Sequence, residues 1–369
     1  MRVIFSKLIY PFIIGSSLWS AFPPLNLNYL VFVSLVLFLL GLEQTKNSFS
    51  YGYSFYLGAV IAFIGHWFSY YFRLQLHSGY VVSYLLTLVI CVYTALYIGI
   101  ICFIYARTKS KSLLLNLCLL FPSLWVLTEL VRGFFFPRSW YALGNTQVDN
   151  FLFAGYYPLL GSYFVSWLVV AIAGWISYLI LCRNSRTLGK TIAFAGVSGV
   201  VFLLVSYMLA MIHYTKPYGK PLTVALVQPS IFSSTQFTTD KQMMIESISY
   251  NLLAKTSADL LVLPETVFSI DYHYLTPGYL DRLHNLIQQK HAQLILGSPI
   301  HWSDTPHQTG VINISNPDKP IYFKHFLVPF GEYNPLKNTF LNPLLNNIGF
   351  RIAEYIPGSY TQSPLTILG

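Results

Sequence analysis

Long apolar runs alternate with short polar stretches over the first 213 residues of the chain. A helix needs about 17–25 mostly apolar residues to cross a bilayer. Seven runs approach or reach this length, and we predict a helix for each: residues 6–22, 28–43, 53–72, 80–105, 112–132, 159–182 and 190–213. The first two runs are short and are joined by Phe22-Pro23-Pro24, which is typical of a tight connection.

After Lys216 the apolar stretches become short enough for strands. Strands are expected at 221–228, 259–263, 293–298, 310–315 and 321–327, and helices at 240–255 and 277–290. Strands that alternate with helices and end in a strand pair indicate an α/β domain. The predicted fold is therefore a multi-span α-helical membrane domain, residues 1–213, followed by an α/β domain, residues 214–369.

Composition and charge agree with a membrane protein. Hydrophobic residues make up 54% of the chain and charged residues 9%, whereas a soluble domain carries about 25% charged residues. The net charge is +9, but residues 214–369 hold ten basic and ten acidic side chains, so the excess lies in residues 1–213. A neutral soluble segment argues against a nucleic-acid partner.

The loop charges predict an orientation for the helices. Positive residues gather on the cytoplasmic side of membrane proteins. With the N-terminus in the cytoplasm, seven crossings place nine Lys or Arg residues in cytoplasmic segments and three in outer ones. Everything after His213 then lies outside the cytoplasm.

Two features of the membrane part have more than one interpretation. Glu129 and Arg132 are three residues apart, so they share a helix face and can pair. Charges within a span favour a functional role by default, although two interfacial residues that only neutralise each other are the simpler alternative. Trp140 lies in an aromatic loop, which suits either an interfacial belt or a contact with lipid or substrate.

Two polar segments in the last third carry candidate chemistry. Glu265 follows an apolar strand, and active sites gather at the carboxyl ends of strands in α/β sheets. A partly buried carboxylate there can act as a general base. Lys324 lies in an aromatic strand, either as an edge charge that prevents aggregation or as a cation that stabilises an oxyanion. Glu332 follows in a turn that Gly331 permits.

The four cysteines all lie in apolar runs without the spacing of metal ligands, and they are Cys91, Cys102, Cys118 and Cys182. Free cysteine behaves as a small buried hydrophobe in such runs. No metal and no cofactor is therefore expected.

The polar segments together resemble those of the apolipoprotein N-acyltransferases, a membrane-embedded family of the nitrilase superfamily. Leu263-Pro264-Glu265-Thr266 matches the family's glutamate segment. Tyr322, Lys324 and 327–332 match its Tyr-x-Lys-x-x-Leu-Val-Pro-Phe-Gly-Glu segment. In the membrane part, Trp125, Glu129, Arg132 and Gly133 resemble its Trp-x-x-x-Glu-x-x-Arg-Gly segment.

This resemblance implies an αββα nitrilase-like sandwich on the periplasmic side of the bacterial inner membrane. It implies ping-pong transfer of an acyl chain from a phospholipid, through a cysteine thioester, to the N-terminal diacylglyceryl-cysteine of an apolipoprotein, by a monomer. Glu265 would be the general base, Lys324 the oxyanion-stabilising or orienting cation, and Glu332 a supporting carboxylate. The residues expected to contact substrate are Phe237, Trp140 and Tyr333.

The chain departs from the family's pattern near its end. The family's cysteine follows a further strand, and 367–369 lie near where that strand would begin. The resemblance therefore predicts an incomplete, C-terminally truncated sandwich that cannot complete a turnover. The alternative is an inactive or repurposed membrane protein whose soluble domain binds lipid or a partner. A transporter is less favoured, because no repeats and no charged pathway beyond Glu129 are found.

Overall fold

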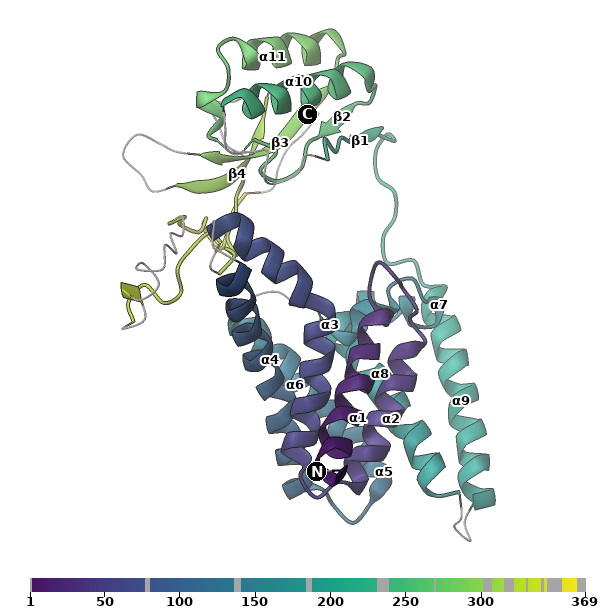
Figure 1. Ribbon diagram of the computed structural model, residues 1–369. Coiled ribbons are helices and arrows are strands. Elements are labelled where there is room, and N and C mark those ends of the chain that lie inside the picture. The colour runs from purple at the N-terminus through teal and green to yellow at the C-terminus, as the bar shows by residue number, and fades with distance from the viewer. Residues whose placement is uncertain are drawn as a thin grey trace. The chain divides into compact units, whose positions relative to one another are not determined.

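The computed structural model describes most of the chain, and its helices and strands fall into two units. Met1–Arg73 and His77–Lys216 form the helical unit, whereas Leu74–Leu76 and Pro217–Gly369 form the unit with the sheet (Figure 1). The described residues are 2–76, 80–135, 141–183, 188–230, 239–268, 270–300, 307–314, 322–329, 331–339, 342–343 and 354–363.

Each of the seven apolar runs is helical. Six of them form α1 (Arg2–Leu18), α2 (Leu30–Gln44), α3 (Ser48–Leu76), α4 (Tyr80–Thr108), α8 (Tyr157–Leu181) and α9 (Leu188–Ala210). The fifth run is divided into α5 (Leu113–Leu115), a π-helical turn η2 (Asn116–Leu120) and α6 (Phe121–Phe135). Pro122 accounts for the wider turn, because proline lacks an N–H and displaces the carbonyl four residues before it. Short elements complete the unit: η1 (Trp19–Ala21), η3 (Leu143–Gln147) and α7 (Phe151–Ala154).

Several of these helices have the dimensions of membrane spans. Among the described residues, four helical segments are long and apolar enough to cross a bilayer: Ser83–Thr108, Leu113–Gly133, Tyr157–Leu181 and Ile192–Ala210. Leu8–Ala21 and Leu30–Gln44 are apolar but shorter. The predicted class of this unit is confirmed, while the count of seven crossings stays a prediction.

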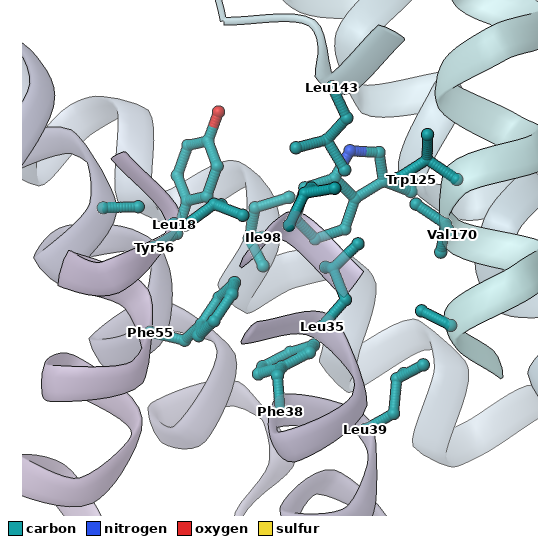
Figure 2. Close-up of a cluster of buried hydrophobic side chains, with 14 of the residues drawn as sticks. Leu18, Leu35, Phe38, Leu39, Phe55, Tyr56, Ile98, Trp125, Leu143 and Val170 are labelled. Carbon is teal, nitrogen blue, oxygen red and sulfur yellow. The ribbon is translucent and has the colours of Figure 1, made fainter. Parts of the chain in front are cut away.

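Figure 2 shows part of the apolar core, to which α1, α2, α3, α4, α6, α8 and η3 contribute side chains. Phe38 of α2 stacks on Phe55 of α3 with 4.1 Å between ring centroids. Glycine brings α1 and α3 into backbone contact: a Cβ at Gly15 would lie 1.7 Å from the Phe55 oxygen, and one at Gly58 would lie 2.1 Å from the Phe12 oxygen. Such close packing drives helix association where lipid removes the hydrophobic difference between inside and outside.

Glu129 and Arg132 are both buried, but they do not form the predicted direct pair. Among the ion pairs of the described residues none joins them. Glu129 Oε1 accepts hydrogen bonds from Trp125 Nε1 and from the Leu143 amide, each at 3.0 Å. Arg132 Nη1 donates to the Tyr56 hydroxyl. The spacing puts both on one helix. Glu129 bonds Trp125 of that helix and Leu143 of η3, whereas Arg132 bonds Tyr56 of α3.

A mixed five-stranded sheet organises the second unit. Its order is β1 (Val224–Leu226), β2 (Leu260–Val262), β3 (Gln293–Ile300), β4 (Gln308–Asn313) and β5 (Tyr322–Phe323). The first three strands are parallel, and β4 and β5 continue the sheet antiparallel. The predicted strands are found, but the first and last are shorter than the expected 221–228 and 321–327.

Two helices, α10 (Thr239–Lys255) and α11 (Tyr279–Gln289), lie side by side on one face of this sheet (Figure 1). Leu261, Leu294 and Leu296 alternate along β2 and β3 and are fully buried in the core with Leu283 and Ile287 of α11. A short 3-10 turn, η5 (Tyr272–Tyr274), follows β2. The unit is therefore an α/β layer, as the sequence predicts.

Candidate active site

Glu265 lies just past the carboxyl end of β2, where the sequence predicts a catalytic carboxylate. Its side chain is 58% exposed, so it is less buried than a base in an apolar pocket. The next residue, Thr266, has a φ of 52°. A β-branched residue in this left-handed region is strained, and such strain collects at functional turns.

Gly297 of β3 lets this turn approach the sheet. A Cβ at Gly297 would lie 2.7 Å from the Glu265 Cα and 3.2 Å from the Thr266 nitrogen. Both are backbone atoms, which cannot rotate away as the end of a side chain can. Glycine at this position therefore helps to determine where Glu265 lies.

Gly297→Ala is expected to displace the Glu265 turn and to destabilise it by about 1–3 kcal/mol, the usual range for overpacking. The change should appear as faster hydrogen–deuterium exchange in peptides that cover 260–268 of the full chain in micelles. Gly189→Ala is the control, because no atom lies within 4 Å of a Cβ there. Unchanged exchange in the Gly297 variant would contradict the proposed contact.

Lys324 joins the two carboxylates of the site. It follows β5, and its amide donates to the Thr309 oxygen at 2.8 Å. Its Nζ lies 2.6 Å from Glu265 Oε1 and 2.8 Å from Glu332 Oε1. The Lys324 side chain is 17% exposed, so the ammonium is largely withdrawn from water. The structure thus brings together Glu265, Lys324 and Glu332, which lie far apart in the sequence.

Glu332 is held by its own turn. Its Oε2 accepts from the Val328 amide at 2.7 Å, while its amide donates to the Val328 oxygen at 2.9 Å. The Tyr355 amide donates to the Glu332 oxygen at 2.8 Å. Burial, and then the negative charge of Glu332, raise the pKa of the Tyr355 phenol. Both the backbone and the side chain of Glu332 are therefore held in place. Its other carboxylate oxygen, Oε1, accepts from Lys324.

An apolar cavity of about 280 Å³ adjoins this cluster. Glu265 and Lys324 line it together with residues of the four strands β2 to β5, among them Ile295, Val311 and Tyr322. A cavity that is apolar apart from a carboxylate and an ammonium suits a ligand with a long apolar part and one reacting polar group.

Of the three residues expected to contact substrate, the structure describes one. Tyr333 is half-buried, follows Glu332, and pairs with Pro329 in an isolated bridge. Phe237 and Trp140 lie outside the described residues. None of the four cysteines lies in 217–369. Within the described parts of the chain, no group of three or more His, Cys, Asp or Glu side chains is placed to hold a metal ion.

Sequence reasoning missed the residues that support the cluster through backbone contacts. Thr309 accepts from the Lys324 amide, Tyr355 donates to Glu332, and Gln362 contacts the backbone of Phe323. No pattern in the sequence signals such contacts. Any residue offers a backbone amide or carbonyl, and nothing around Gln362 marks its side chain as a partner of Phe323.

Comparisons with known proteins agree on one family. A model described as the apolipoprotein N-acyltransferase N-terminal domain matches residues 14–175. A protein of Chromobacterium violaceum named apolipoprotein N-acyltransferase is 30% identical over 96% of this chain and 68% of its own length. Proteins of the same name from Nitrosomonas europaea and Pasteurella multocida are each 28% identical, over 67% and 79% of this chain and 48% and 57% of their own lengths. The chain thus spans about half to two thirds of the length of these relatives.

Proposed function

This chain belongs to the apolipoprotein N-acyltransferase family, and from that premise we propose that it serves in the N-acylation of apolipoproteins. The substrates would be a phospholipid as acyl donor and the N-terminal diacylglyceryl-cysteine of an apolipoprotein as acceptor. One observation carries the proposal: Lys324 Nζ lies between Glu265 and Glu332 at the border of an apolar cavity. The apolar lining suits part of an acyl chain, and the charged border suits its ester carbonyl.

The proposed chemistry is a two-step acyl transfer. Glu265 takes the proton of a cysteine thiol, and the thiolate attacks the ester carbonyl of the phospholipid. Lys324 stabilises the oxyanion that forms, and the glycerol oxygen leaves with the proton from Glu265. The amine of the apolipoprotein then attacks the thioester, transfers its proton through Glu265, and releases the thiol. Glu332 holds Lys324 in place throughout.

The thiol is the part of this reaction that residues 217–369 do not contain. A serine there is no substitute, because a hydroxyl is a far weaker nucleophile without a strong base. The described site therefore supplies a base and a cation. The proposed thiol is not among residues 217–369.

Mass spectrometry of the acceptor tests the proposal. The full chain is incubated in phospholipid–detergent micelles with a diacylated lipopeptide, and a triacylated product is sought. Product that falls at least 100-fold in Glu265→Gln and Lys324→Met supports acyl transfer by this site. Product that survives replacement of all four cysteines by alanine assigns the thiol to another chain, whereas product that both site variants retain would refute the assigned roles.

A binding protein is the second candidate, and the apolar lining of the cavity favours it. In that case the cavity would retain phospholipid without transfer. Native mass spectrometry of the full chain would then show a bound phospholipid that the cavity variant Val311→Trp releases, and the assay above would give no product.

We also propose that residues 1–213 form a transmembrane domain of seven crossings in the bacterial inner membrane. Residues 214–369, with α10 and α11 on one face of the sheet, would be a nitrilase-like layer on the periplasmic side. The excess of positive charge in the cytoplasmic loops supports this orientation. The acyl acceptor would meet the site on that side.

The orientation predicts which introduced cysteines react from outside. In a chain whose four cysteines are replaced, Tyr218→Cys is expected to react with a membrane-impermeant maleimide in intact cells, and Lys111→Cys only after lysis. Both positions are exposed, so access to solvent within the protein does not limit either reaction. The reverse pattern would overturn the proposed orientation.

A further inference from the structure

Residues 354–363, called the strap below, run beside β5 next to the candidate lysine. The side-chain amide of Gln362 contacts both backbone groups of Phe323. The Phe323 amide donates to Gln362 Oε1 at 2.8 Å, and Gln362 Nε2 donates to the Phe323 oxygen at 2.8 Å. Gln362 Nε2 also donates to the Ser359 oxygen at 2.9 Å. One side chain thus makes the pair of bonds that a neighbouring strand makes in an antiparallel ladder.

Gly358 of the strap bonds the backbone of Lys324, the residue that follows Phe323. Its amide donates to the Lys324 oxygen at 2.8 Å, and its own oxygen bonds His325 Nδ1 at 2.8 Å. Gly358 is buried, and a Cβ there would lie 2.4 Å from the Phe323 oxygen. Since Lys324 also donates to Thr309 of β4, its backbone is bonded on both sides.

The first residues of the strap contact the backbone of Glu332. The Tyr355 amide donates to the Glu332 oxygen at 2.8 Å, and the Ile356 amide donates to the His307 oxygen at 2.9 Å. The strap therefore contacts the backbones of Lys324 and of Glu332. These are the two residues whose side chains meet at 2.8 Å.

We propose that the strap is a positioning segment of the active site, with Gln362 and Gly358 as its principal residues. This inference rests on the proposed function for its biological meaning, but not for its test. β5 has two residues, so it ends before Lys324 and offers little ladder to fix that residue. The strap supplies the missing edge, and it thereby sets the Cα from which the lysine reaches both carboxylates. None of its residues is assigned a chemical step.

A long flexible side chain makes such positioning necessary. Lysine has many rotamers, and holding its ammonium in one place opposes a substantial rotamer entropy. If the backbone of Lys324 were not fixed, the contacts to Glu265 and Glu332 would have to order the backbone as well as the side chain. Fixing the backbone first leaves only the side chain to be ordered by the carboxylates.

Competitive acetylation of lysines in the full chain tests this role without any need for turnover. The protein in micelles is treated with acetic anhydride, and mass spectrometry compares Lys324 with Lys255, which is exposed on α10. Lys290 reports general unfolding, because its Nζ donates to the Ala254 and Thr256 oxygens. Gln362→Met should raise acetylation of Lys324 by a factor of about 5 to 150, as expected from the loss of two net hydrogen bonds.

A pair of variants separates hydrogen bonding from packing. Methionine matches glutamine in size but has no amide, whereas asparagine keeps the amide on a shorter side chain. Positioning by hydrogen bonds predicts that acetylation of Lys324 rises more in Gln362→Met than in Gln362→Asn. A packing role predicts the opposite order, and that order would overturn the proposal.

Gly358→Ala provides an independent change, because its methyl group would push the strap from Phe323. It too should raise acetylation of Lys324 relative to Lys255, with Lys290 unchanged. Lys324 acetylation that stays at the wild-type level in both Gln362→Met and Gly358→Ala would refute the strap. Increased acetylation in a chain that gives no triacylated product would support the strap while counting against the proposed function.

Discussion

Lys324→Met is expected to destabilise the region around β5 by about 1.5–3 kcal/mol, the usual range for hydrogen bonds to charged groups. The lysine is the cation shared by Glu265 and Glu332, so its loss leaves two carboxylates without their counterion. Hydrogen–deuterium exchange of the full chain would measure the effect at the amides of residues 324, 328 and 332. Each of these amides donates to a protein acceptor within the cluster or beside it.

The ion pair of Lys324 with Glu332 should be stronger than its ion pair with Glu265. Glu332 is 16% exposed and Glu265 is 58% exposed. An exposed ion pair contributes about 0–1 kcal/mol and weakens as salt shortens the Debye length from about 10 Å at 0.1 M to 3 Å at 1 M. A double-mutant cycle with Glu332→Gln should therefore give a larger coupling to Lys324 than a cycle with Glu265→Gln, and one less sensitive to salt.

Substitutions of Glu265 and Glu332 should rank in one order by loss of stability and in the opposite order by loss of acyl transfer. Glu265→Gln is expected to change stability little but to abolish acyl transfer, because Glu265 is the proposed base. Glu332→Gln is expected to cost more stability and to reduce transfer only through Lys324. Equal coupling of both glutamates to Lys324 would contradict this division between a reacting and a supporting carboxylate.

The sequence predicts elements better than it predicts contacts. Apolar runs place the helices, since hydrocarbon leaves the backbone few other ways to satisfy its polar groups. Short stretches placed strands at 259–263 and 293–298, within two residues of the bounds of β2 and β3. Among the described residues of the expected strand 321–327, only Tyr322 and Phe323 belong to β5. The Lys324 amide still donates to Thr309 of β4, but the Lys324 oxygen accepts from Gly358 of the strap.

The candidate site was predictable in part. Its three charged residues were identified from their segments, and the structure brings them within hydrogen-bond distance. The strap was not, because its contacts to Lys324 and Glu332 are made by backbone groups that every sequence contains. The direct pairing of Glu129 with Arg132 was predicted from spacing alone. That prediction was wrong because spacing cannot show which groups of other segments compete for each charge.

Glu129→Leu is expected to destabilise the helical unit by about 2–5 kcal/mol. Glu129 is 3% exposed, and its Oε1 accepts from Trp125 Nε1 and from the Leu143 amide. Leucine leaves both donors buried without an acceptor, at about 1–3 kcal/mol each. It also removes the electrostatic attraction between Glu129 and the buried Arg132, which adds to the loss. Unfolding of the full chain by SDS titration in mixed micelles would measure the difference.

Two matched variants test whether the loss of stability in Glu129→Leu is caused by the loss of its hydrogen bonds. Glu129→Gln keeps an acceptor oxygen in a side chain of the same shape, so it should lose much less stability than Glu129→Leu and should preserve slow exchange at the Leu143 amide. Leu130→Ala changes the next residue, which is 40% exposed, and should stay within about 0.5 kcal/mol of the wild type. If Glu129→Leu were as stable as Leu130→Ala, the carboxylate would not join α6 to η3. If Glu129→Gln were as unstable as Glu129→Leu, the charge beside Arg132 would outweigh the two hydrogen bonds.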